Sequence, residues 1–126
     1  MEGAGQVTLE SSGLGTYDVT WASRAEDPAG RTSPEELIAA AHSACFSMAL
    51  SHALAQAGTP PERLETSADV TFQPGEGITG IHLKVRGTVP GLSKEDFTGA
   101  ADKAKAGCPV SKALTGTKIT LDASLT

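Results

Sequence analysis

Two cysteines, Cys45 and Cys108, are the residues of this 126-residue chain best suited by type to covalent chemistry. A cysteine reacts as the thiolate, so each of them needs a cause for a lowered pKa. Cys45 lies about three turns inside a predicted long helix, where the helix dipole no longer acts. A neighbouring cation must therefore stabilise a Cys45 thiolate, and without one Cys45 is a small hydrophobic residue of the core.

Cys108 occupies a different predicted position. Pro109 disfavours a helical conformation at Cys108 and suits the first position of a short helix, Val110 to Leu114, so Cys108 becomes its N-cap. An N-cap thiol faces free N–H groups and gains anionic character from them, and we expect this loop thiol to be accessible. A buried helical thiol and an exposed capping thiol fit an attacking cysteine with a resolving partner. The alternative is a capping cysteine without a redox role.

Arginine is the cation best suited to activate Cys45, because it stays protonated and its planar fork can face a thiolate and a carboxylate together. Arg24 and Arg31 are the two candidates, and Glu35 is a possible orienting carboxylate. Glu35 precedes Cys45 by ten residues, a separation of nearly three helical turns that a stretched guanidinium bridges only in part. The alternative is two solvated loop charges and a first-turn carboxylate favoured by the helix dipole.

A metal site is not expected. His42 lies three residues before Cys45 on the same helix face, and with Cys108 it could supply three ligands. The sequence contains no CxxC or HxxxH pair and no evident fourth ligand, and His52 and His82 have no partner at ligand spacing. We therefore expect a histidine of the core or of an interface at position 42 and no metal or other cofactor.

The long helix that carries Cys45 has clear start and stop signals. Ser33 is the predicted N-cap, Pro34 suits the first helical position, and Glu36 completes a capping box. The helix should run to Ala57 and stop at Gly58. Its middle, residues 38–50, holds no formal charge, and a helix that is apolar on all sides is normally buried.

The other elements follow from apolar alternation and turn residues. Residues 6–25 predict a hairpin, with Trp21 in its second strand and Arg24 at the end of that strand. A helix should begin after Ser93 and end at Gly107. Three more strands are predicted over residues 64–72, 81–89 and 118–125. This order predicts an α+β fold built on hairpins rather than on parallel βαβ units.

Composition limits the class of protein. The length fits one domain, residues 1–126, and 39% hydrophobic and 20% charged residues are typical of a globular chain. A net charge of −5 without a basic cluster argues against nucleic acid. The sequence shows no signal peptide and no run of 18 uninterrupted apolar residues, so we expect a soluble, cytoplasmic protein without a membrane partner.

Two runs of residues point to a known family. TSPEELIAAAHSACFSMALSHAL (residues 32–54) and KAKAGCPVSKAL (residues 103–114) resemble the OsmC/Ohr family of hydroperoxide reductases, and its OsmC branch more closely than its Ohr branch. Weaker resemblance extends over the remaining strands.

The resemblance implies a function and an assembly. Members of this family are metal-free thiol peroxidases that reduce organic hydroperoxides and, in the OsmC branch, hydrogen peroxide. Cys45 matches the peroxidatic cysteine, Cys108 the resolving cysteine, and Glu35 the carboxylate that holds the catalytic arginine, for which we expect Arg24, with Arg31 as its rival. The resemblance also implies an intertwined homodimer whose long helices pack centrally and whose sites lie at the subunit interface, with a lipoyl-type dithiol as reductant.

One departure from the family pattern supports an alternative. Family members usually begin with a further strand, containing a tryptophan, before the segment that matches residues 3–13, and this sequence lacks that strand. The alternative function is a non-enzymatic dimeric stress or ligand-binding module on the same scaffold.

Overall fold

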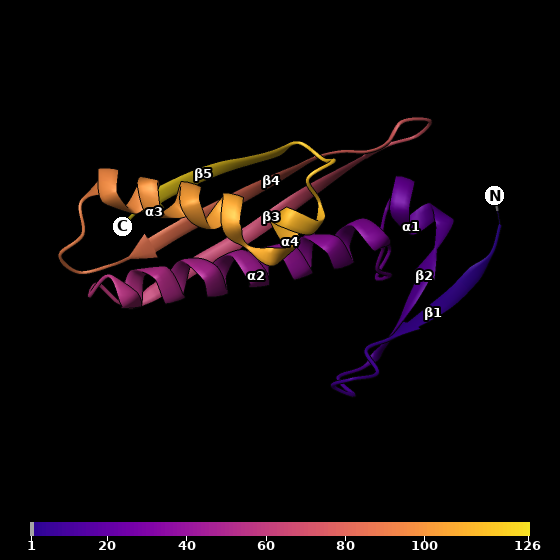
Figure 1. Cartoon of the computed structure of the whole chain (residues 1–126). Coiled ribbons are helices and arrows are strands. Elements are labelled where there is room, and N and C mark those ends of the chain that lie inside the picture. The colour runs from indigo at the N-terminus through magenta and orange to yellow at the C-terminus, as the bar shows by residue number, and fades with distance from the viewer. Residues whose placement is uncertain (1) are drawn as a thin grey trace.

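The computed structural model of the protein describes residues 2–126. Its elements confirm the predicted α+β class (Figure 1). In chain order they are β1 (Ala4–Thr8), β2 (Thr16–Thr20), α1 (Trp21–Ala25), α2 (Pro34–Gln56), β3 (Arg63–Gln73), β4 (Gly77–Thr88), α3 (Lys94–Gly107), α4 (Pro109–Ala113) and β5 (Ile119–Leu125).

The main sheet has the strand order β3-β4-β5. β3 and β4 form an antiparallel pair, with a register shift between Thr71 and Phe72. β5 pairs with β4 in parallel, from Ile81 opposite Ile119 to Gly87 opposite Leu125. The prediction of antiparallel hairpins throughout was therefore wrong for β5, because α3 and α4 form the long crossover that a parallel pair requires.

Helix α2 begins and ends as its sequence signals predict. Ser33 is the N-cap, its side chain accepts from the backbone N–H of Glu36, and Gly58 follows the helix with a φ of +87°. The reciprocal half of the capping box does not form: the Glu36 carboxylate accepts instead from the Thr32 hydroxyl at 2.6 Å. The hydroxyl group of Thr32 thus takes the place of the predicted Ser33 backbone donor.

The junction of α3 and α4 differs from prediction at one residue. Ser93 caps α3 as expected and accepts from the backbone N–H of Asp96. Gly107 does not end α3 in a left-handed conformation; it is the last helical residue, and extended Cys108 is the C-cap of α3. Cys108 is also the predicted N-cap of α4, so one cysteine connects two helices directly.

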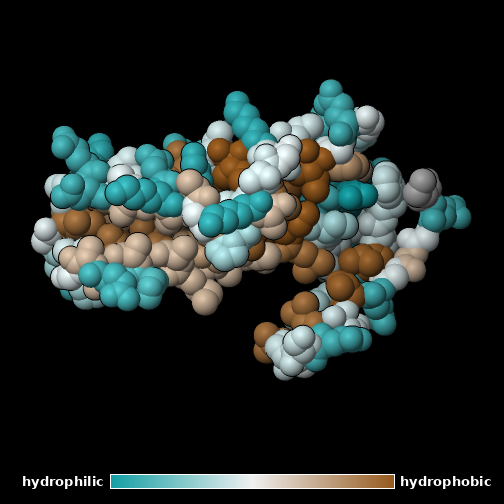
Figure 2. Space-filling model, viewed as in Figure 1, coloured by the Kyte–Doolittle hydropathy of each residue, from teal (hydrophilic) through white to brown (hydrophobic). Residues whose placement is uncertain are grey.

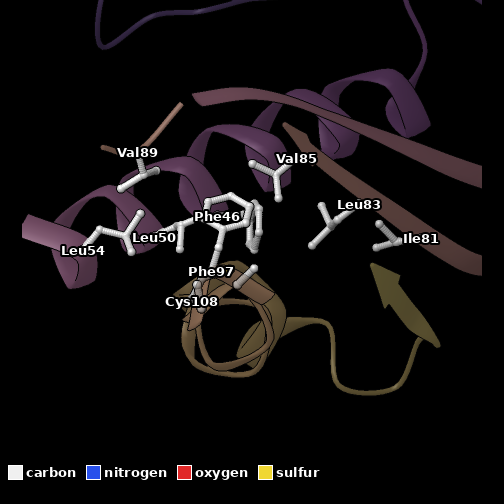
Figure 3. Packing of buried hydrophobic residues seen from close by; sticks show 11 residues of the cluster. Phe46, Leu50, Leu54, Ile81, Leu83, Val85, Val89, Phe97 and Cys108 are labelled. Atoms are coloured by element: carbon white, nitrogen blue, oxygen red, sulfur yellow. The ribbon is translucent and has the colours of Figure 1, made fainter. Parts of the chain in front are cut away.

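The hydrophobic core lies between the sheet and the helices α2 and α3, and Cys108 belongs to it (Figure 3). Phe46 and Leu50 of α2 and Phe97 of α3 have no exposed surface. The Phe97 ring of α3 lies against Gly87 of β4, where an added Cβ would lie 2.7 Å from the ring. The other large buried side chains are Leu54, Ile81, Leu83, Val85 and Val89.

The β1–β2 hairpin stands away from this body, beside the N-terminal end of α2 (Figures 1 and 2). Leu14, Tyr17 and Trp21 are exposed on it and on the turn of helix that follows. Trp21 was predicted in the strand but lies in α1, because Thr20 and Ser23 form a reciprocal capping box that starts a helix there. The prediction that Arg24 ends a strand was wrong for the same reason.

One face of α2 is also bare. Met48 is 72% exposed, and Ala40, Ala41 and Ala44 are exposed on the same helix. By length and composition α2 could span a membrane, a test that core helices of soluble proteins pass as well. Helix α2 is apolar on all sides, but only one side of it packs against the rest of the chain.

Candidate active site

Cys108 is the more deeply buried of the two cysteines, with no exposed surface. It was expected to be accessible, and this was wrong because α2 and α3 cover the start of α4. Its Sγ accepts from the backbone N–H of Ser111 at 3.4 Å, as an N-cap should, and lies 3.1 Å from the Ser111 hydroxyl. The thiol is thus surrounded by hydrogen-bonding groups rather than by solvent.

Cys45 is half-buried on α2, and both cysteines are free thiols. Burial raises the pKa of Cys45, the backbone N–H of Val110 opposes this by hydrogen bonding to the sulfur, and Cys108 raises the pKa of Cys45 further as a hydrogen-bond partner and by its charge. The two cysteines therefore lie close together, beside the first residues of α4.

His42, one turn before Cys45, contacts the same cluster. It is fully buried, and its Nε2 lies 2.7 Å from the Ser111 hydroxyl. Its Nδ1 has no hydrogen-bond partner in the described chain, and burial lowers the pKa of the imidazole. Position 42 is therefore a core histidine, one of the two environments predicted for it. Within residues 2–126 no three His, Cys, Asp or Glu side chains are grouped to hold a metal ion.

Arg24 and Glu35 form the ion pair that the sequence suggested. The Nε of Arg24 lies 2.8 Å from Oε1 and 3.1 Å from Oε2 of Glu35, a carboxylate that is only 6% exposed. The guanidinium also lies over two aromatic rings, 4.5 Å from the centroid of Phe72 and 5.3 Å from that of Trp21. The Glu35 carboxylate raises the pKa of Arg24, which is therefore a permanent cation.

The rival, Arg31, lies on the exposed loop between α1 and α2. Its backbone N–H donates to Pro28, and in the described part of the chain its side chain forms no ion pair with Glu35. Of the two arginines, the structure brings only Arg24 to the carboxylate.

The thiol pair and the arginine pair are not brought together within one chain. Glu35 and Cys45 are ten residues apart on α2, a rise of about 15 Å. Arg24 is directed at Glu35, and no cation in residues 2–126 contributes to the pKa of Cys45. The four predicted residues thus form two separate clusters on one helix.

Two apolar side chains near Cys45 on α2 lie in different environments. Phe46 is a core residue facing the sheet, and Met48 is exposed beside a surface groove of about 570 Å³ near the end of α2. A second hollow, of about 360 Å³, lies beside the Arg24–Glu35 pair and is bordered by Phe72.

Sequence reasoning missed two contributors. Phe72 contacts the guanidinium from β3, beside the register shift between Thr71 and Phe72. Ser111 lies three residues after Cys108, the spacing at which a residue contacts an N-cap side chain, so its contact with the sulfur could have been predicted.

Comparison with known proteins adds a family. Residues 26–122 match the family model described as OsmC-like protein. The chain is 48% identical to the peroxiredoxin OsmC of Escherichia coli, over 98% of this chain and 87% of that protein. It is 34% identical to the organic hydroperoxide resistance protein of Xanthomonas axonopodis, over 75% of this chain and 66% of the relative. These names support a peroxide-related redox role and, at the level of the family, peroxidase activity.

Solved structures agree on the fold. The organic hydroperoxide resistance protein OsmC of Legionella pneumophila superposes with a TM-score of 0.68 at 22% identity and covers 100% of this chain and 96% of its own. The protein OhrB of Bacillus subtilis superposes with a TM-score of 0.65 at 22% identity, covering 100% of this chain and 98% of its own. The family match, the sequence identities and the shared fold lead to one conclusion: this chain belongs to the OsmC family of peroxide-related redox proteins.

Proposed function

We propose that the protein is a two-cysteine, metal-free peroxidase that reduces organic hydroperoxides, and hydrogen peroxide as well, to alcohols and water. The observation that carries this proposal is that Cys45 and Cys108 lie close enough for Cys108 to raise the pKa of Cys45, while the backbone N–H of Ser111 holds the Cys108 sulfur at the start of α4. Two free thiols held as neighbours can pass from dithiol to disulfide without rearrangement of the fold.

The half-buried thiol, Cys45, is the one that meets the peroxide, because Cys108 has no exposed surface. The Cys45 thiolate attacks one oxygen of ROOH, the O–O bond breaks, and the alkoxide takes a proton to leave as ROH. Cys45 becomes a sulfenic acid. The Cys108 thiolate then attacks the sulfur of Cys45, forms the disulfide, and releases hydroxide, which a proton converts to water.

A dithiol closes the cycle. One of its sulfurs attacks the disulfide, its second sulfur displaces the protein from the mixed disulfide, and both cysteines return to thiols while the reductant becomes a disulfide. Family resemblance suggests a lipoyl-type dithiol in the cytoplasm as this reductant.

The activating cation comes, on this proposal, from a second copy of the chain. In one chain burial and Cys108 raise the pKa of Cys45, and Arg24 lies beside Glu35, which precedes Cys45 by a helical rise of about 15 Å. Residue 40 lies midway between positions 35 and 45. Antiparallel packing of two α2 helices about a two-fold axis near Ala40 therefore brings Glu35 and Arg24 of the partner subunit level with Cys45.

The surfaces left bare in one chain support this homodimer. Ala40, Ala41 and Ala44 are exposed small residues that allow two helices to approach closely, and Met48 continues the same face. The β1–β2 hairpin, with exposed Leu14, projects from the body where a second copy could hold it. A dimer that buries these surfaces also explains why α2 is apolar on all sides.

A stoichiometric titration tests the proposal. Reduced protein is treated with cumene hydroperoxide, and free thiols are counted. The proposal predicts the loss of two thiols per chain in the wild type and no loss of the remaining thiol in Cys45→Ser, while His82→Asn, which alters an outer-face histidine, behaves as wild type. Unchanged thiol counts in the wild type would favour a non-enzymatic module on the same scaffold.

The resolving role of Cys108 has its own test. In Cys108→Ser we expect one turnover followed by overoxidation of Cys45 to the sulfinic acid, visible by mass spectrometry. Sustained turnover of Cys108→Ser with a dithiol would reject that role.

A further inference from the structure

The reaction cycle does not use one buried polar group, His42, although it lies within two hydrogen bonds of a reacting sulfur. The His42 Nε2 is 2.7 Å from the Ser111 hydroxyl, and that hydroxyl is 3.1 Å from the Cys108 Sγ. The three side chains come from α2 and α4, and each is buried. A buried polar chain that ends on a reacting sulfur calls for a functional explanation.

The direction of these hydrogen bonds follows from the unpaired Nδ1 of His42. A neutral imidazole carries one N–H, and a buried N–H without an acceptor is rarer than a buried acceptor without a donor. The lone pair is therefore on Nδ1 and the proton on Nε2, because only Nε2 has a partner. Burial lowers the pKa of His42, which keeps the imidazole in this neutral form.

The single hydroxyl proton of Ser111 determines the next hydrogen bond in the chain. If His42 Nε2–H donates to the Ser111 oxygen, the single hydroxyl proton of Ser111 is free to donate to the Cys108 sulfur. The backbone N–H of Ser111 donates to the same sulfur at 3.4 Å. With this assignment Cys108 receives two donors from Ser111, and donors to a sulfur stabilise its anionic form.

We propose that His42 and Ser111 are positioning residues that hold negative charge on the sulfur of Cys108, making it the thiolate that closes the disulfide and the thiolate that leaves when a dithiol opens it. This proposal rests on the two-cysteine cycle. In reductive opening, a reductant thiolate attacks the Cys45 sulfur, the S–S bond breaks, and its electron pair goes to Cys108, where the Ser111 donors receive it. A leaving thiol of lower pKa departs faster.

The groups that face Cys108 are few. From α2 they are Cys45, in contact, and His42, through Ser111. Lys105 of α3 and Lys112 of α4 are the nearest charged residues along the chain, and within residues 2–126 neither donates to this sulfur.

The first experiment measures the titration of Cys108 alone. In a Cys45→Ser background, the ultraviolet absorbance of the thiolate is followed against pH, which does not require access to the buried sulfur. We expect Ser111→Ala to raise the midpoint by about one pH unit, a tenfold loss of thiolate at a given pH below it. Ser124→Ala, on the exposed face of β5, is the matched control and should leave it unchanged.

Substitutions at His42 separate donation from packing. His42→Phe keeps a buried ring without a donor and should shift the Cys108 midpoint in the same direction by a smaller amount. His42→Gln places an amide N–H near the position of Nε2 and should restore most of the wild-type value. Equal midpoints in wild type, Ser111→Ala and His42→Phe, all folded by circular dichroism, would overturn the proposal.

The second experiment follows the reductive step. Oxidised protein is mixed with N-acetylcysteine, trapped with acid, and mapped by mass spectrometry. We expect the adduct on Cys45, with Cys108 released, and a fall in the rate of adduct formation of about threefold to tenfold in Ser111→Ala. An adduct mainly on Cys108, or an unchanged rate in Ser111→Ala, would contradict it.

The two proposals fail in different ways. If the protein does not react with peroxide while the Cys108 midpoint moves as expected, the peroxidase function fails and the hydrogen-bond chain stands. If two thiols per chain are oxidised while the midpoint does not move, the role of His42 and Ser111 fails and the peroxidase function stands.

Discussion

The thiol pair and the arginine pair lie on the same helix but differ in what surrounds them. Cys45 and Cys108 are enclosed by α2, α3 and α4 of one chain, and Ser111 of that chain contacts the Cys108 sulfur. Arg24 and Glu35 lie at the other end of α2, where the hairpin leaves the body of the chain. The thiol pair is complete within one chain. The arginine pair contacts neither cysteine of that chain.

The two halves of the proposed chemistry, disulfide formation and activation of Cys45, therefore depend on different parts of the structure. On the proposed function, the disulfide-forming half depends on packing within one chain, so any folded chain contains it. The activating half depends on assembly, because the proposal assigns the cation at Cys45 to a second copy of the chain. We therefore expect some substitutions to reduce activity without unfolding the chain, and others to change its stability without changing the chemistry.

The largest effect is expected from a charge on the bare face of α2. Ala44→Glu places an unpaired carboxylate where two helices would meet, and burying it there is strongly unfavourable. We expect folded monomers by light scattering and circular dichroism, with peroxidase activity reduced about a hundredfold or more. Ser124→Glu adds the same charge to the outer face of the sheet and should remain dimeric and active. A fully active Ala44→Glu monomer would refute the assembly argument.

Removal of the proposed cation should have a smaller effect. Arg24→Ala removes the proposed cation, so burial and Cys108 raise the pKa of Cys45 against the Val110 N–H alone, and the Cys45 thiolate should form only at higher pH. We expect the pH profile of Cys45 alkylation to shift upward by at least about one unit, and the rate at neutral pH to fall about tenfold. Arg31→Ala is the matched control. A shift in Arg31→Ala alone would transfer the role to that arginine.

Tightening the enclosed region should change stability rather than chemistry. In Gly87→Ala the new methyl group meets the Phe97 ring at 2.7 Å, and overpacking of this kind typically lowers the free energy of unfolding by about 1–3 kcal/mol. Gly99→Ala, in α3 with open space around it, should instead raise the free energy of unfolding by about 0.5–1 kcal/mol. Denaturant unfolding measures both values. Equal stability of the two variants would show that the Phe97 ring does not lie against Gly87 as described.

The sequence predicts features that depend on neighbouring residues better than features that depend on contacts between distant segments. Start and stop signals are local, so α2 was predicted from Ser33 to Gly58, and the N-cap position of Cys108 followed from Pro109. Burial of Cys108, the parallel pairing of β5 and the position of Phe72 beside Arg24 depend on contacts between distant segments, which spacing does not encode. The helix at Trp21 was missed for a different reason: its capping pair, Thr20 and Ser23, lies inside an alternating pattern typical of a strand.

The measurement that most directly tests the division of the site between subunits is complementation between two impaired variants. Cys45→Ser and Arg24→Ala proteins are each assayed for peroxidase activity, then unfolded together in equal amounts, refolded and assayed again. If each site combines Cys45 of one subunit with Arg24 of the other, every mixed dimer has one intact site, and random mixing should restore about a quarter of wild-type activity. Activity that stays at the mean of the two variants, with mixed dimers confirmed by native mass spectrometry, would contradict the account.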